Sequence, residues 1–472
     1  MESLWFIIIV ITLSLCATLF NLLHKTPKRL PPGPVSIPFI TSFQWLRKPR
    51  EALEPTLRSL KEKYGPIITL SIGHQKSIFI TNSSLAHQAL IQHGAIFGDR
   101  PPASATTKIA SSNQHTISDA CYGPLWRLFR KNLTLQILHP SKIKSFSPAR
   151  KWVLNIIKSS VQKESNSGKT PVLVVDHLRF GKFIFKKKWG DFSKWRSDQE
   201  EVLIPLIRSR QEQMKRSSGE IHDEKSSLGF CYVDSLLNLE LPDEGGRKLT
   251  ENEMVSLCSE FVDAGTDTTS TALQWILSNL VKYRDIQSKL YDEIRKISDD
   301  CDDDEIQEED LMKLPYLKAV VLEGLRRHPP AHFGLDHAVT QDVGLDGYVV
   351  PKEAIVNFML AEIGWDPKIW GEDSMIFKPE RFLNEDDGSL NEEMSDVTGN
   401  KAIKMIPFGA GRRMCPASGL AVLHLEYFVA NLIKKFKWSP KAGDDIDLTE
   451  KREFTTVMKN PLWAHVSPRK QD

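Results

Sequence analysis

The sequence lacks an excess of either charge and contains few cysteines. Its 62 Lys and Arg residues balance 60 Asp and Glu residues, and a net charge of +2 gives no electrostatic reason to expect a nucleic-acid partner. The six cysteines in 472 residues include no CxxC pair, which argues against a disulfide scaffold and a structural zinc site. No HExxH or GxSxG motif occurs. Because 41% of the residues are hydrophobic, a large core can form and global disorder is excluded.

One long hydrophobic run stands near the N-terminus. Leu4–Leu23 contains no charge, and a helix of this length spans about 30 Å, the thickness of a bilayer core. Basic residues follow it, so the positive-inside rule places the rest of the chain in the cytosol. A cleaved signal peptide would instead begin with basic residues and end at a small-residue cleavage site. We therefore expect a membrane anchor over residues 1–25, a Pro-rich hinge over 26–40 and one folded domain over 41–472.

The body of the chain is predicted to be mainly α-helical. The longest helical pattern runs from Thr250 to Val281, and Thr250 with Glu253 has the spacing of a capping box. A second pattern, Ala417–Phe436, is strongly apolar. Runs typical of β-strands gather at residues 67–81 and 347–360. These patterns predict a helical domain with a small β-rich flank.

Cys415 stands between a Gly-rich loop and the start of a helix. A helix N-terminus carries partial positive charge, and Arg412 and Arg413 would add to it. Such surroundings lower the pKa of a thiol, so we expect Cys415 to be a thiolate or a metal ligand. A buried, inert cysteine is the usual alternative for an isolated residue. Two glycines, two arginines and a helix start in one stretch favour the functional interpretation.

The residues around Cys415 resemble a known signature. Phe408-x-x-Gly411-x-Arg413-x-Cys415 is similar to the haem-binding pattern FxxGxRxCxG of the cytochrome P-450 family, with Ala417 in place of the final Gly. The resemblance implies that the cofactor is haem b and that the Cys415 thiolate is the axial ligand of its iron.

A second motif lies in the centre of the longest predicted helix. Ala264-Gly265-Thr266-Asp267-Thr268 resembles the family motif A/G-G-x-D/E-T. Gly and Thr are weak helix formers, so this centre is unfavourable without a functional reason. The resemblance implies a groove for O2 and water, in which Asp267 and Thr268 pass protons. A helix that merely bends is the alternative.

Two further motifs follow in the order of the family. Glu323-x-x-Arg326 shares one helix face, and Arg381 belongs to a sequence similar to the family's PERF motif. By this likeness the three side chains form a buried charged network that braces the Cys415 loop.

A WxxxR sequence implies how haem propionates would be bound. Trp126 and Arg130 resemble the family's haem-edge pair, joined by Arg413 and His337. Exposed arginine on an amphipathic helix is the simpler alternative. A basic surface for an acidic electron donor would comprise Arg127, Lys131, Lys404 and Arg412.

The resemblance is strongest to plant microsomal members. It implies a monomeric haem-thiolate monooxygenase, anchored once in the endoplasmic reticulum membrane lipid with a cytosolic catalytic domain. It would insert one oxygen atom of O2 into a small apolar substrate, using NADPH indirectly through NADPH–cytochrome P-450 reductase. Two alternatives stay open: an isomerase or dehydratase that needs no O2, which Thr268 disfavours, and a degenerate, non-catalytic haem-binding membrane protein.

The chain also departs from the family pattern in the length of one interval and at Asp336. The interval between Arg130 and Ala264 is short, which suggests an internal deletion near Phe180–Trp189 that removes part of the substrate roof. Asp336 stands where the family tends to have proline, and a charge there is costly unless it is paired or solvated. Expected substrate contacts are Pro102–Thr116, Ala331–Leu335, and the helix face around Phe261 and Asp263.

Overall fold

The computed structural model describes most of the chain. The described residues are Trp5, 9–16, 29–36, 43, 45, 47–49, 52–72, 75–178, 192–217, 230–298, 305–441 and 445–469. Most of the predicted anchor and the whole of the predicted deletion site, Phe180–Trp189, lie outside these residues. Within the described part, no helix combines the length and the apolar character needed to cross a membrane.

The chain folds into two compact units, and it passes between them several times. One unit, here called the β-rich unit, comprises Met1–Pro101, Ala331–Met375 and Asp396–Met414. The other, here called the helical unit, comprises Pro102–Pro330, Ile376–Ser395 and Cys415–Asp472.

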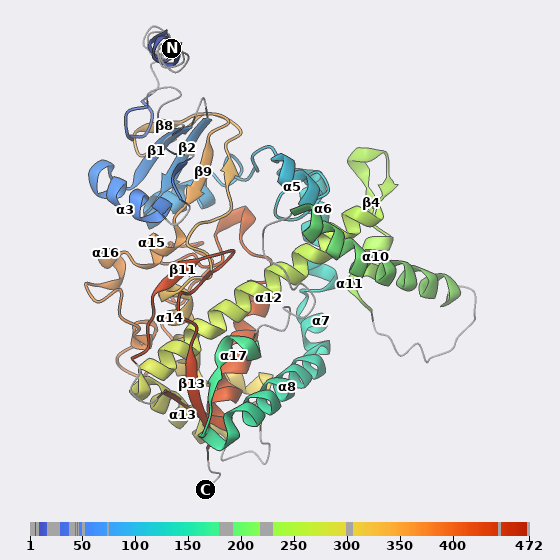
Figure 1. Ribbon diagram of the computed structural model, residues 1–472, viewed down its shortest axis with the longest axis vertical. Helices are drawn as coiled ribbons and strands as arrows, with labels where there is room; N and C mark the ends of the chain where they lie inside the picture. Colours follow the sequence, from blue (N-terminus) through green and yellow to red (C-terminus); the bar gives the residue numbers. More distant parts are fainter. Residues whose placement is uncertain are drawn as a thin grey trace. The chain divides into compact units, whose positions relative to one another are not determined.

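A four-stranded sheet organises the β-rich unit. Its order is β1 (Ile67–Ile72), β2 (Gln75–Ile80), β9 (Ile355–Phe358) and β6 (His337–Ala338), and β2 pairs with β9 in parallel. Figure 1 shows β9, from late in the sequence, beside the early strands β1 and β2. The predicted β-runs at 67–81 and 347–360 are therefore confirmed. The unit also contains β7 (Val343–Leu345), β8 (Tyr348–Val350), α3 (Leu53–Tyr64), α4 (Ser83–His87), η2 (Gln88–Gln92), α15 (Leu360–Gly364), α16 (Pro367–Trp370) and η8 (Gly411–Arg413).

The long helix α12 (Glu251–Lys282) is the centre of the helical unit. Its predicted capping box is confirmed, because the Glu253 amide donates to Thr250 Oγ1 at 3.3 Å and the Thr250 amide donates to the Glu253 carboxylate at 2.8 Å. It packs against α10 (Phe192–Ser217), α14 (Pro315–Arg327) and α17 (Ser418–Lys435). The remaining elements include α5 (Ala105–Ala110), α6 (Pro124–Gln136), α7 (Pro140–Ser145), α8 (Ser147–Ser165), α9 (Val174–Leu178), α11 (Tyr232–Leu237), α13 (Arg284–Ser298), η5 (Pro242–Glu244), η6 (Glu308–Lys313) and η7 (Pro379–Phe382).

The helical unit also holds a sheet that the sequence patterns did not predict. Its order is β10 (Phe436–Pro440), β13 (Trp463–Pro468) and β3 (Pro171–Leu173). The strands are short, and Ala464 pairs with Val172 from a distant part of the sequence. Local periodicity therefore carries no signal for this sheet. Two hairpins complete the unit: β4 (Glu240–Leu241) with β5 (Arg247–Lys248), and β11 (Glu450–Arg452) with β12 (Thr456–Met458).

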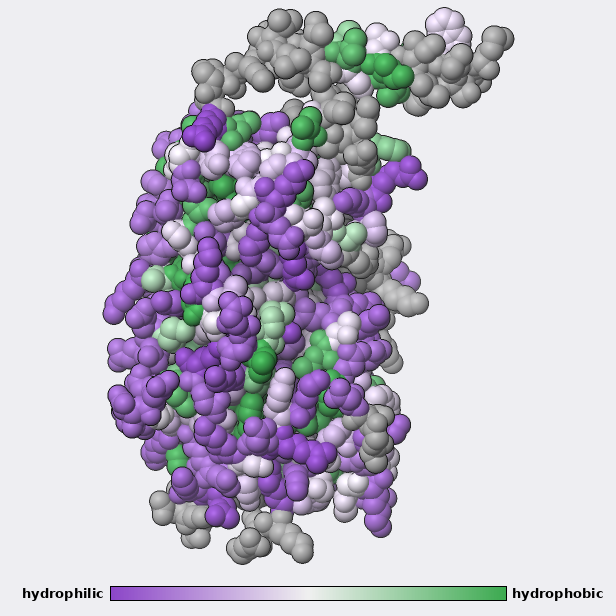
Figure 2. Space-filling model, turned by 90° about the vertical axis from the view of Figure 1, so that its left-hand side faces the viewer, coloured by the Kyte–Doolittle hydropathy of each residue, from purple (hydrophilic) through white to green (hydrophobic). Residues whose placement is uncertain are grey.

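The face shown in Figure 2 is mainly hydrophilic. Its hydrophobic residues form small groups among charged and polar ones. Scattered apolar residues of this kind are normal on the surface of a folded protein, so the coloured part of this face does not indicate a broad apolar interface.

Glu426 of α17 predicts a measurable dependence of stability on pH. Its side chain is buried, Oε1 has no hydrogen-bond partner in the described structure, and burial raises its pKa to about 7 although Lys318 acts against this. Between pH 4.5 and 7 the folded chain holds a proton that the unfolded chain releases, so the stability from this group falls as pH rises. Glu426→Gln lacks this titrating group. Its stability relative to wild type should therefore be higher at pH 8 than at pH 5, by up to about 3 kcal/mol.

Thermal unfolding of both proteins at pH 5 and pH 8 measures this difference. Exposed Glu385 provides a matched control, because Glu385→Gln should shift stability little at either pH. A difference between Glu426→Gln and wild type that stays constant from pH 5 to pH 8 would contradict the prediction.

Candidate functional site

Cys415 lies just before α17, as predicted, and its side chain is half-buried. Burial raises the pKa of its thiol, while a hydrogen bond from the Ala417 amide and the charge of Arg130 lower it in part. The thiol by itself therefore favours the neutral form. Metal coordination would reverse this preference, because a coordinating thiol is deprotonated.

The expectation that Arg412 and Arg413 lower the pKa of the Cys415 thiol is wrong. Arg412 is exposed, and Arg413 Nε donates to the carbonyl oxygen of Gly98 at 2.7 Å. The cation that influences the sulfur is instead Arg130 of α6. Proximity in the sequence did not predict the direction of these side chains.

The loop before Cys415 requires glycine at Gly411. Both Gly409 and Gly411 have left-handed backbone, with φ of +69° and +68°. A Cβ on Gly411 would lie 2.1 Å from the carbonyl oxygen of Leu90, whereas the nearest atom to a Cβ on Gly409 is 4.0 Å away. Only Gly411 therefore lets the loop backbone approach η2. Phe408, at the start of the loop, is half-buried.

Trp126 and Arg130 lie on α6, which begins with Pro124 in its first turn. Trp126 is buried, and the Arg130 guanidinium lies 5.9 Å from the centre of its ring. Arg130 is half-buried, and burial lowers its pKa. No carboxylate of the described residues forms an ion pair with it. A partly buried guanidinium of this kind fits an external carboxylate such as a haem propionate.

His337 lies in the β-rich unit close to two arginines. It is buried, and its Nδ1 donates to the Phe97 carbonyl oxygen at 2.6 Å. Burial and the nearby charges of Arg100 and Arg413 lower its pKa to about 3. His337 is therefore a neutral hydrogen-bonding group beside two cations, an arrangement that fits an anion.

Asp336 is tolerated because it is both solvated and hydrogen-bonded. Its side chain is exposed and accepts a hydrogen bond from Asn357 Nδ2 at 2.8 Å. Its carbonyl oxygen accepts from Arg100 at 2.6 Å. A charge at this position was expected to be costly unless it is paired or solvated, and Asp336 is both solvated and hydrogen-bonded.

The centre of α12 is open, although residues 253–259 and 270–281 on either side of it are buried. Ala264 and Gly265 are exposed, and a Cβ on Gly265 would meet no atom within 4 Å. The Thr268 hydroxyl donates to the Ala264 carbonyl oxygen at 2.6 Å, and Asp267 is half-buried beside it. The motif residues therefore lie on or beside an exposed stretch of the helix. Their role in proton transfer stays a prediction.

Glu323, Arg326 and Arg381 come together in the helical unit. The side chains of Glu323 and Arg326 are both 0% exposed and form two hydrogen bonds, at 2.6 and 2.8 Å. Arg381 Nε lies 3.7 Å from the Glu323 carboxylate, which also accepts from the Lys378 amide at 2.8 Å. These contacts join α14 to the segment before and within η7. Bracing of the Cys415 loop stays a prediction.

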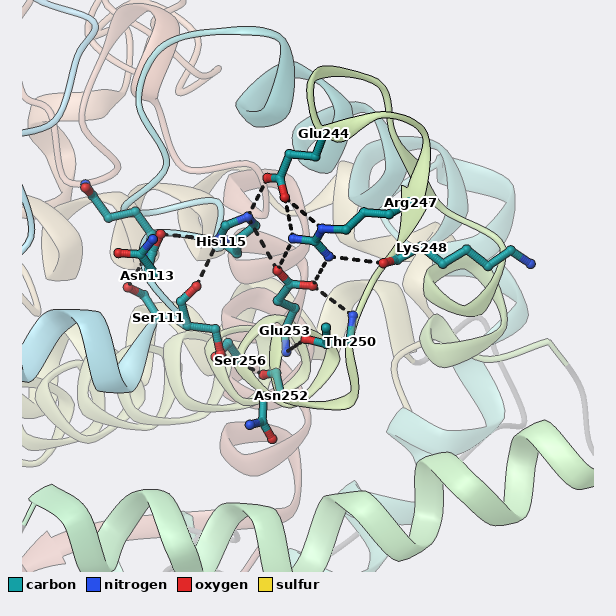
Figure 3. Close-up of polar contacts among 12 residues, drawn as sticks. Ser111, Asn113, His115, Glu244, Arg247, Lys248, Thr250, Asn252, Glu253 and Ser256 are labelled. Carbon is teal, nitrogen blue, oxygen red and sulfur yellow. Dashed lines mark hydrogen bonds and ion pairs between the residues drawn. The ribbon is translucent and has the colours of Figure 1, made fainter.

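The sequence patterns missed an ionic cluster around His115. His115 Nε2 lies 2.8 Å from Glu244 and 3.4 Å from Glu253, and Nδ1 lies 2.9 Å from the Ser112 carbonyl oxygen (Figure 3). Both ring nitrogens of His115 therefore face oxygen atoms of neighbouring residues. Arg247 bridges the same two carboxylates. The cluster fixes part of the expected substrate loop against the start of α12, through partners too distant in sequence to form a motif.

Comparisons with known proteins identify the family of the chain. The family model for cytochrome P450 matches residues 31–179 and 164–465. Cytochrome P450 89A9 of Arabidopsis thaliana is 44% identical over 498 residues, covering 94% of each chain. Costunolide synthase of Cichorium intybus is 29% identical and covers 98% of each chain. A zebrafish cytochrome P450 structure with abiraterone has the same fold, with a TM-score of 0.66 and 22% identity over 88% of this chain and 100% of that chain.

The chain therefore belongs to the cytochrome P450 family. It is a plant-type P450 and a monooxygenase, in the class of haem-thiolate oxidoreductases.

Proposed function

We propose that this monooxygenase inserts one oxygen atom of O2 into a small apolar molecule, with electrons supplied from NADPH by NADPH–cytochrome P450 reductase. The observation that carries the proposal is Cys415, placed between the Gly411 loop and the start of α17 in the signature pattern. The comparisons do not favour a degenerate protein or an isomerase.

The family cofactor is haem, and the residues present fit it. When bound, haem supplies O2 activation at iron, which a thiolate ligand promotes. Cys415 would hold the iron through its sulfur. Trp126 and Arg130 would bind one propionate, and Arg130 has the charge and partial burial that this needs. By the family resemblance, His337 and Arg413 would also be propionate-binding residues.

Asp267 and Thr268 would deliver protons from the open centre of α12. The Thr268 hydroxyl holds its proton toward the Ala264 carbonyl oxygen, and rotation about χ1 would turn it toward water instead. Asp267, one residue earlier, would resupply the proton through water. Ala264 and Gly265 would leave room for these small molecules.

We further propose that Leu4–Leu23 anchors a monomer in the endoplasmic reticulum membrane, with the catalytic domain on the cytosolic side. The length of the uncharged run and the basic residues after it support this topology. The exposed bases Arg127, Lys131 and Arg412 offer contacts for an acidic reductase.

An internal deletion near residues 180–189 is also part of the proposal. The alignment with the Arabidopsis thaliana relative extends over 498 residues, more than the 472 of this chain, so part of the relative has no counterpart here. The family model matches in two stretches that overlap at residues 164–179. The first finding supports a missing segment, and the second supports a break in the family pattern near the predicted position.

The carbon monoxide difference spectrum of the reduced, full-length protein in lipid nanodiscs tests the haem ligand. We expect the Soret band of a thiolate-ligated haem in wild type and its complete loss in Cys415→Ala. Cys121→Ala is the control, because Cys121 is exposed, and it should keep the band. Wild-type protein without haem, or a thiolate band that survives in Cys415→Ala, would refute the proposed ligand.

A further inference from the structure

Asp263 is a carboxylate on α12 that the proposed chemistry does not use. It lies one helical turn before Asp267 and is half-buried. Its Oδ2 accepts a hydrogen bond from Gln199 Nε2 of α10 at 3.1 Å, and Gln199 is completely buried. A buried amide thus fixes the position of the carboxylate from a neighbouring helix.

Both groups have acceptor capacity left over. Within the described residues, Asp263 has no hydrogen-bond donor besides Gln199 and forms no ion pair. Gln199 Oε1 has no hydrogen-bond partner there at all. Buried polar atoms are nearly always paired in folded proteins, so an unpaired amide oxygen next to a carboxylate needs an explanation. A missing donor is the direct explanation.

The surface beside Asp263 is open. Val262 is 37% exposed, and Ala264 and Gly265 are exposed too, although residues 254–259 and 270–281 of the same helix are buried. Burial, with the charge of Asp267 as a second cause, raises the pKa of Asp263 to about 6. Because this value lies below 7, the carboxylate is mainly ionised at neutral pH, and none of the described residues forms an ion pair with it.

We propose that Asp263, positioned by Gln199, recognises a cationic N–H donor group on the substrate, such as a protonated amine or an amidinium. The inference rests on the proposed function, since it makes the open face of α12 part of the substrate site. An otherwise apolar substrate would gain orientation from one charge-assisted hydrogen bond. Neutral and anionic analogues of the same shape would bind more weakly, because they leave the carboxylate unpaired or repel it.

Three ligands of the same shape and different charge test this inference. The probes are 4-hexylbenzamidine, 4-hexylbenzamide and 4-hexylbenzoate, titrated calorimetrically into the full-length haem protein in nanodiscs. We expect the amidine to bind wild type about tenfold more tightly than the amide, with the benzoate weakest. Asp263→Asn should reduce the amidine preference to less than about threefold. Gln199→Met should lower it as well, because it removes both the amide that positions Asp263 and the unpaired oxygen beside the carboxylate.

The controls separate charge recognition from folding and from the proposed function. Asp285→Asn removes an exposed carboxylate of α13 and should keep the wild-type preference. The carbon monoxide spectrum of each preparation is recorded first, so that loss of the thiolate band reports failure of the proposed function separately. A thiolate-ligated wild type that binds amidine and amide equally, or an Asp263→Asn variant that keeps the full preference, would overturn the inference.

Discussion

Replacing Glu323 with glutamine is expected to lower the free energy of unfolding by about 3–5 kcal/mol. Glutamine keeps the shape of the side chain but removes the charge that faces Arg326. Both partners are 0% exposed, so water cannot replace the lost interaction. Burial raises the pKa of Glu323, while Arg326 opposes that shift, which shows how unfavourable this position is for an isolated charge.

Chemical denaturation followed by tryptophan fluorescence measures the loss. The surface pair Arg208–Glu251 is the matched control, since it is also bidentate but has side chains 61% and 38% exposed. Glu251→Gln should change stability by less than about 1 kcal/mol. The double variant Glu323→Gln/Arg326→Met should recover part of the loss, because it removes the unpaired cation too. Equal effects of Glu323→Gln and Glu251→Gln would contradict this prediction.

The pair was predictable because its two members are neighbours on one helix turn. The hydrogen bond from the Lys378 amide to Glu323 was not predictable. Lys378 stands 55 residues further along the chain, so no helical spacing relates it to Glu323. The long helix α12 shows the same contrast. Its capping box is local and was predicted residue by residue, whereas the sheet β10–β13–β3 depends on pairing between distant strands and left no pattern.

Within the candidate site, the motif predicted the position of Cys415 but not its electrostatics. Arg412 and Arg413 are adjacent in sequence, yet one is exposed and the other binds the Gly98 carbonyl oxygen. The influence of Arg130 on the sulfur depends on how α6 packs. The hydrogen bond from Gln199 to Asp263 depends in the same way on the packing of α10 against α12. Spacing along the chain identifies residue types, while packing decides which of them face each other.

The two glycines of the Cys415 loop should respond very differently to alanine. Both need left-handed backbone, which costs a residue other than glycine about 1–2 kcal/mol. For Gly409→Ala this strain is the whole effect, because its new Cβ has no neighbour closer than 4.0 Å. For Gly411→Ala the Cβ would also stand 2.1 Å from the backbone oxygen of Leu90, and neither segment can turn a side chain away to relieve the overlap.

We therefore expect Gly411→Ala to lose at least about 3 kcal/mol of unfolding free energy, whereas Gly409→Ala loses about 1–2 kcal/mol. Since the loop leads directly into Cys415, Gly411→Ala should also contain much less haem as purified. Haem content per chain and denaturation midpoints, measured on the two variants side by side, distinguish overlap from backbone strain. Equal losses in both variants would mean that the loop does not depend on its approach to η2, and that only its left-handed turns require glycine.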